Sequence, residues 1–308
     1  MRGFTLVELL VAITVLTLIM LGVSQMMNST VTITLGGFKH MDADTQSRLV
    51  LDRIAFDVSK MVKRTDVDYY FNNSTSAPNN GYGSDMMLFF SEATGYYPDP
   101  TTTDQSTVSL VGYRMNSSYQ LERLSKGLVW NGVAPVSQNY PMVFLPQTII
   151  GTWGANNNLT KSPGGDADYQ VIGDQVFCMK LSYLIQKDAS TLQLTDTPNT
   201  TSITAGSTGY FDPTRVQAII VTIAVLDSNS QKLLPNASTQ LQAAATKLDG
   251  VLPTPPATTP LAKLPLNLWQ TKLSTEMGSG GYLGLGKTVA SQVRFYQRYC
   301  YLNQVLQQ

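Results

Sequence analysis

Histidine is the scarcest chemically useful residue in this chain, which has one, His40, among 308 residues. A single histidine excludes any multi-histidine metal site. We expect His40 on a helix just outside a membrane, which also excludes the usual Ser-His-Asp and Cys-His catalytic sets. Charge is also scarce, since 21 basic and 21 acidic residues cancel and only 14% of the chain is charged. This balance gives no general attraction to nucleic acid or anionic lipid. We therefore expect no enzyme, no cofactor and no specific nucleic-acid partner.

Cysteine is limited to Cys178 and Cys300, each in an apolar, aromatic segment. Two cysteines allow a single disulfide if the body lies in an oxidising compartment. Buried free thiols are the open alternative, because unpaired cysteine is among the most buried residue types. A Cα separation above roughly 7 Å would exclude the bridge.

The chain does have a long apolar run, Phe4 to Val23, which as a helix could cross a bilayer at roughly 1.5 Å per residue. An ionised Glu8 near its start is costly in hydrocarbon, so it needs a partner charge at the same depth. Cleavage between Gly3 and Phe4 would create an α-amine about one helical turn away, which a stacked neighbouring helix could offer. A secretory signal peptide is disfavoured because no small-residue cleavage site follows Val23. A plain membrane anchor remains the alternative.

A second helical pattern follows Gly36-Gly37, from about residue 39 to residue 64. Arg53 and Asp57 lie four residues apart, and we expect both on the solvent-exposed face of this helix. We predict one long N-terminal helix in which the two glycines allow a hinge or local melt. The apolar positions of its second half form a single stripe of Leu51, Ile54, Ala55, Val58, Met61 and Val62.

From residue 66 onward, short apolar or alternating runs are bounded by Gly, Pro, Asn and Asp, which predicts strands. Asn116 to Ser118 reads as a hairpin turn, and residues 240–248 as a short helix. The fold class is therefore α+β, with a long N-terminal helix packed on a mainly antiparallel sheet and long Thr/Ser/Asn-rich loops. We expect a leader at residues 1–3, a helix at 4–65 that spans the membrane over 4–23, and a β-rich extracytoplasmic body at 66–308. The predicted strands are 86–90, 108–115, 119–124, 176–185, 216–226 and 292–302.

Two further patterns have competing interpretations. Residues 281–288 match the P-loop pattern letter for letter, but no apolar strand precedes them, so we expect a glycine loop leading into the last strand. The aromatic triplet Tyr69 to Phe71 could be an adhesive patch, but we favour packing of the helix end against the sheet.

The segment Gly3-Phe4-Thr5-Leu6-Val7-Glu8 resembles the class III prepilin signal of type IV pilins and type II secretion pseudopilins. This resemblance implies cleavage after Gly3 by a prepilin peptidase, methylation of the new Phe4 amine, and a role for Glu8 in assembly. The implied partners are other pilin-like subunits, the inner-membrane assembly platform and the membrane itself. The implied location is the inner membrane, crossed once, with the body in the periplasm or on the cell surface.

The plan of the body is similar to that of J-type minor pseudopilins, through residues 51–53, 111–114 and 121–123. Residues 61–71 and 218–227 resemble the pilin-like proteins called Verru_Chthon cassette protein C, which implies architecture more than function. Some pseudopilins bind calcium, so Asp166, Asp168 and Asp174 form a calcium candidate, although a solvated turn is our default interpretation. Two roles stay open: a structural subunit of a pilus-like or secretion filament, or a tip subunit that recognises a surface, a secreted substrate or DNA.

Overall fold

The computed structural model describes residues 5–64, 67, 69–72, 84–96, 105–127, 168–188, 191–196, 215–249 and 264–302. The chain divides into two compact units, Met1–Asp44 and Thr45–Gln308. We expected the body to begin at residue 66. Instead, the last turns of the N-terminal helix group with the body, because their side chains are part of its core.

Helix α1 runs from Leu6 to Ser59 without interruption, so it is helical through Gly36 and Gly37. Within the second unit, most of its apolar stripe is buried as predicted, with Ile54 and Val58 fully inaccessible to solvent, while Ala55 and Val62 are partly exposed. The helix ends before the predicted residue 65, because Met61 already pairs with Ser91 at the sheet.

A seven-stranded sheet has the order β1-β2-β5-β6-β3-β4, with β7 added to β6. Its pairs are antiparallel except β3 with β6. The predicted turn joins β5 to β6, where the Asn116 side chain accepts hydrogen bonds from the backbone of Ser118 and Gln120. The strands are β1 (Tyr70–Asn72), β2 (Met86–Ser91), β3 (Gly95–Tyr96), β4 (Gln105–Ser106), β5 (Ser109–Met115), β6 (Leu121–Gly127) and β7 (Gln170–Gly173).

A second, four-stranded sheet is antiparallel throughout and has the order β11-β10-β8-β9. The central strands β8 and β10 are covered on both faces, so their residues are buried almost without alternation. The strands are β8 (Val176–Asp188), β9 (Thr191–Thr195), β10 (Val216–Val225) and β11 (Arg294–Tyr301). The α+β class and its antiparallel body are confirmed.

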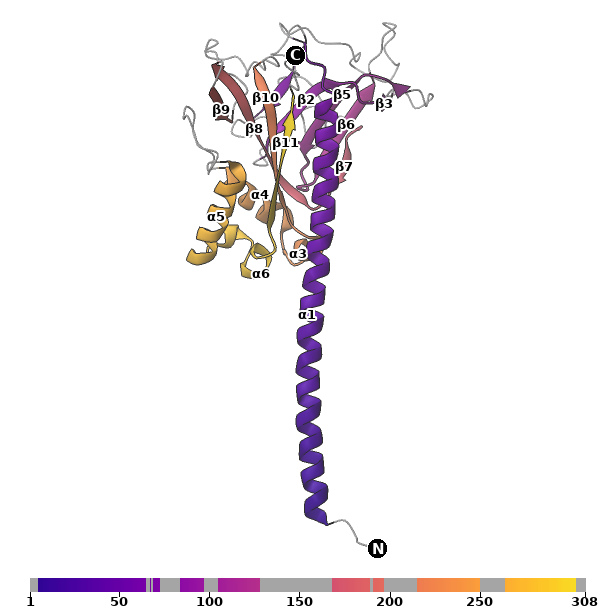
Figure 1. The fold of residues 1–308 in the computed structure, drawn as a ribbon, viewed down its shortest axis with the longest axis vertical. Helices are drawn as coiled ribbons and strands as arrows, with labels where there is room; N and C mark the ends of the chain where they lie inside the picture. The colour runs from indigo at the N-terminus through magenta and orange to yellow at the C-terminus, as the bar shows by residue number, and fades with distance from the viewer. Residues whose placement is uncertain are drawn as a thin grey trace. The chain divides into compact units, whose positions relative to one another are not determined.

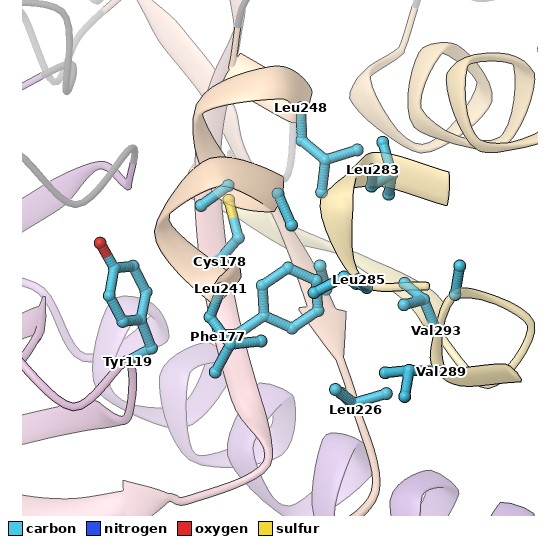
Figure 2. Packing of buried hydrophobic residues seen from close by; sticks show 14 of the residues in the cluster. Tyr119, Phe177, Cys178, Leu226, Leu241, Leu248, Leu283, Leu285, Val289 and Val293 are labelled. Atoms are coloured by element: carbon cyan, nitrogen blue, oxygen red, sulfur yellow. The ribbon is translucent and has the colours of Figure 1, made fainter. Parts of the chain in front are cut away.

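A group of helices covers one part of this second sheet (Figure 1). Figure 2 shows Phe177 of β8 among side chains from these helices, and the whole cluster is buried. Trp269 is also fully buried, and its indole N–H donates to the carbonyl of Leu248 at 3.0 Å. The elements are α3 (Ser228–Gln231), α4 (Ala237–Asp249), α5 (Pro265–Ser279), the short 3-10 helix η3 (Tyr282–Gly284) and α6 (Lys287–Ala290).

Candidate functional site: the N-terminal signal and the buried charges of the body

The first feature of functional interest is the apolar part of α1. The most apolar stretch within Leu6–Val31 has a mean hydropathy of 2.6, and none of it is buried in the structure. This is the one described helix that is long and apolar enough to cross a membrane. It extends the predicted span, residues 4–23, toward the C-terminus.

Glu8 lies in the first turn of this helix and binds Thr5. Its Oε2 accepts hydrogen bonds from the Thr5 backbone N–H at 2.9 Å and from the Thr5 hydroxyl at 2.7 Å. The Glu8 N–H in turn donates to the Thr5 hydroxyl at 3.4 Å. This reciprocal arrangement is a capping box, which satisfies backbone donors that a helix start leaves unpaired. Glu8 therefore has a local role that the sequence analysis missed, although the pattern Thr-x-x-Glu could have shown it. Gly3 and Phe4, the expected processing residues, lie outside the described residues.

The family model for the prokaryotic N-terminal methylation motif matches residues 1–24. None of the curated proteins compared with the chain matches it. The motif covers both the Gly3-Phe4 junction and Glu8, so the chain carries a type IV pilin-like prepilin signal. An N-terminal apolar helix with this signal also indicates membrane anchoring, by one span in the described part of the chain. The finer likeness to Verru_Chthon cassette protein C stays a prediction.

In the body, Asp57 of α1 is a buried charge that ties the helix to the larger sheet. Its Oδ2 accepts hydrogen bonds from the Tyr113 hydroxyl at 2.6 Å and from Arg123 Nε at 2.7 Å, while Arg53 Nε is 3.6 Å away. Burial and the Asp57 carboxylate both raise the pKa of Tyr113, so this phenol stays protonated. Our expectation that Asp57 lies on the wet side of the helix is wrong, because its side chain is fully buried.

A second buried charge, Lys180 on β8, joins the two sheets. Its Nζ lies 2.8 Å from Asp85 Oδ1, just before β2, and also contacts Asp249 at the end of α4. Asp85 in addition binds the β8 backbone, accepting from the Leu181 N–H at 2.8 Å and donating its own N–H to the Met179 carbonyl at 2.9 Å. Burial lowers the pKa of Lys180, but the two carboxylates outweigh it, so the net shift is upward and the ammonium stays charged.

The two cysteines do not form the disulfide that the sequence allowed, and the alternative of two buried free thiols is what the structure shows. Cys178 is opposite Ala224 on β10, whereas Cys300 is opposite Ile219 on the other side of that strand. Ala224 lies five residues beyond Ile219, which at ~3.4 Å per residue separates the two levels by about 17 Å. This distance is far beyond the reach of a disulfide.

We therefore expect neither thiol to react with iodoacetamide in the folded protein at pH 8. Burial raises the pKa of Cys178 and of Cys300 to about 12, so only about one thiol in ten thousand is ionised at that pH. Both pKa values lie above the unfolded value of about 8.5, so the folded state holds these two protons more tightly than the unfolded state. The free energy of unfolding should therefore be unaffected by the thiols below pH 8.5 and should fall as the pH rises above it.

Mass spectrometry after alkylation tests this expectation. Both cysteines should be modified in denaturant without any reductant. Modification that required a reductant would instead show that the sulfurs are bridged.

The calcium candidate is not assembled by the described residues. Asp166 lies outside them, Asp168 pairs with Lys126 Nζ at 2.8 Å, and Asp174 accepts a hydrogen bond from Gln46. No group of three or more potential metal ligands occurs in the part of the chain that the structure describes. His40 is part of α1, but its side chain lies outside the described residues.

The other two interpretations can now be compared with the structure. Helix α5 precedes the P-loop-like segment, where a phosphate-binding loop would follow a strand, and Lys287 begins the short helix α6. The predicted glycine loop is thus partly helical. The aromatic triplet is buried, and the Phe71 and Tyr183 rings meet edge to face with centroids 5.7 Å apart. The triplet is therefore packed rather than an exposed patch, but Tyr70 and Phe71 belong to β1 of the sheet itself and not, as we expected, to a helix end packed against it.

Proposed function

We propose that this chain is a minor pilin or pseudopilin, a structural rather than an enzymatic subunit. A prepilin peptidase removes residues 1–3, and the mature chain then assembles with other pilin-like subunits on an inner-membrane platform. The body lies in the periplasm or on the cell surface. The observation that supports the proposal best is the methylation motif at residues 1–24, which overlaps the apolar first part of α1, whose most apolar window has no buried residue.

This arrangement suits a helix that changes partners. An apolar segment whose described residues are exposed can be surrounded by lipid before assembly and by neighbouring helices afterwards. A plain anchor would need the first environment alone and would not need a carboxylate at position 8.

Crosslinking in native membranes, followed by capture of the chain, tests the proposal. Photo-crosslinkers placed within Leu6–Val31 should capture other proteins that carry the same N-terminal motif. A matched crosslinker on an exposed position of α5, such as Thr271, controls for random collision. Crosslinks to lipid alone from every position of the helix would contradict the filament role and favour a simple anchor.

A further inference from the structure

Among the described residues, β11 is an edge strand of the four-stranded sheet. Its one strand partner in the described part of the chain is β10. The Leu302 N–H donates to the carbonyl of Gln217 in β10 at 2.9 Å. This bond shows which residues of β11 form backbone hydrogen bonds with β10 and which do not. In an antiparallel pair, every second residue bonds the partner. Cys300 therefore bonds β10, whereas Tyr299 and Tyr301 direct their backbone N–H and C=O groups away from it.

A groove lies beside this edge. It has a volume of about 460 Å³ and is lined by residues of α1 and by the end of β11, all within the Thr45–Gln308 unit. A helix that covered the edge closely would leave no such space. The volume is typical of binding pockets in proteins. Its lining residues are Asp52, Ala55, Phe56 and Ser59 of α1 and Arg298, Tyr299, Cys300 and Tyr301 of β11.

The groove lining includes three aromatic rings and one pair of opposite charges, Asp52 and Arg298, and two further basic residues lie against Phe56. Phe56 is 45% exposed and Tyr301 60% exposed, and both rings line this one groove. The Lys60 ammonium lies 4.4 Å from the centroid of the Phe56 ring, and the Arg53 guanidinium carbon lies 5.6 Å from it. The Arg298 charge is balanced by Asp52. Arg53 also lies 3.6 Å from the buried Asp57, whose carboxylate Arg123 contacts at 2.7 Å. The described groups thus leave a small excess of positive charge beside the groove, on Lys60 and on the Arg53–Asp57–Arg123 cluster.

We propose that this groove binds an extended acidic segment of a partner protein, which adds to β11 as a fifth strand. The backbone of the segment pairs with Tyr299 and Tyr301, its apolar side chains contact Phe56, and its carboxylates face Lys60 and Arg53. Strand addition takes its affinity from main-chain hydrogen bonds and its specificity from alternate side chains. The proposal goes beyond assembly through the N-terminal helix, since it concerns the body alone.

Binding of short fluorescent peptides to the full-length chain in detergent micelles tests the proposal. The probe is an eight-residue peptide of sequence Glu-Ser-Val-Ser-Glu-Ser-Val-Ser, which puts glutamate and valine on the same face of the added strand. One matched peptide carries lysine in place of glutamate, and another carries N-methyl groups on the amides that would pair with β11. The glutamate peptide should bind and should slow hydrogen exchange at the Tyr299 and Tyr301 amides. The two matched peptides should bind at least about tenfold more weakly, because each lacks one of the two interactions.

A pair of variants separates backbone pairing from the loss of a ring. Tyr301→Pro removes an outward N–H without removing a bond to β10, so the fold should persist, since proline is tolerated on a free edge. This variant should bind the glutamate peptide about tenfold more weakly, whereas Tyr301→Ala, which keeps the N–H, should lose less than about threefold. Thermal melting of both variants checks that they are folded.

Several results would overturn the proposal. These are no binding of the glutamate peptide, equal binding by the lysine or N-methylated peptide, or unchanged affinity in folded Tyr301→Pro. Equal competition by a single-stranded oligonucleotide of the same charge would instead identify a general polyanion surface. Light scattering that showed self-association lost in Tyr301→Pro would assign the edge to a second copy of this chain. None of these results depends on filament assembly, so failure here leaves the proposed function untouched.

Discussion

Lys180→Ala is expected to lower the free energy of unfolding of the body by about 3–5 kcal/mol. The reason is that Asp85 and Asp249 would keep their charges next to β8 while losing the ammonium that balances them. Asp85 and Lys180 are each only about 1% exposed, so water cannot replace the lost partner. Equilibrium denaturation of the full-length chain in detergent, followed by near-ultraviolet circular dichroism, measures the change.

Lys247→Ala is the matched control for this prediction. It also removes a lysine from an ion pair with a carboxylate, at 3.0 Å, but its side chain is 40% exposed. Solvent-exposed ion pairs contribute little to the free energy of unfolding, so the denaturation midpoint of Lys247→Ala should hardly differ from that of the unmodified chain. If Lys180→Ala shifted the midpoint no more than Lys247→Ala, then the buried cluster would not be what holds the two sheets and α4 together.

Glu8→Ala is expected to reduce incorporation into a filament by at least about tenfold, since a charge left unpaired in hydrocarbon is much costlier than a paired one. The substitution removes the carboxylate that we propose meets the Phe4 amine of a neighbouring subunit. The body should keep its stability, because Glu8 lies in the separate Met1–Asp44 unit. Crosslinking of assembled complexes in membranes, beside thermal melting of the same samples, measures both effects.

The capping box requires two further variants, because Glu8→Ala also removes the hydrogen bonds to Thr5. Glu8→Gln can still cap the helix but carries no charge, so it should fail as Glu8→Ala does. Thr5→Ala weakens the cap and keeps the charge, so it should assemble. The reverse pattern would show that the helix start, rather than the charge, determines assembly.

Elements with strong periodicity could be predicted from the sequence. Strands β2, β5, β8, β10 and β11 and helix α4 occur within a few residues of their predicted places. Each is bounded by turn residues and is buried enough for apolar side chains to dominate its pattern. The apolar stripe of α1 was predicted for the same reason.

Helix α5 was missed because the pattern of its side chains is weak. Only Pro265 and Trp269 are buried among its residues, and polar side chains occupy about half of its positions, so no continuous apolar stripe marks it in the sequence. Its ends did carry signals, since Pro265 is at the first helical position and Gly280 ends the helix in a left-handed conformation, with φ of 79°.

The buried charges could not be predicted because their partners are remote in sequence. The spacing of Arg53 and Asp57 fits an exposed pair equally well. What buries Asp57 is Tyr113 and Arg123, which are 56 and 66 residues away along the chain. The N-terminal signal differs in this respect, because all of its residues lie within residues 1–24 and need no tertiary contact to be recognised.

Intact-mass and N-terminal peptide mass spectrometry of the chain purified from native membranes is the most direct test of the pilin-like assignment. The account predicts a mature chain that begins at Phe4, with Met1 to Gly3 removed and one methyl group on the Phe4 amine. A second sample from cells without prepilin peptidase should retain Met1. An intact Met1 in both samples, or cleavage beyond Val23, would contradict the assignment.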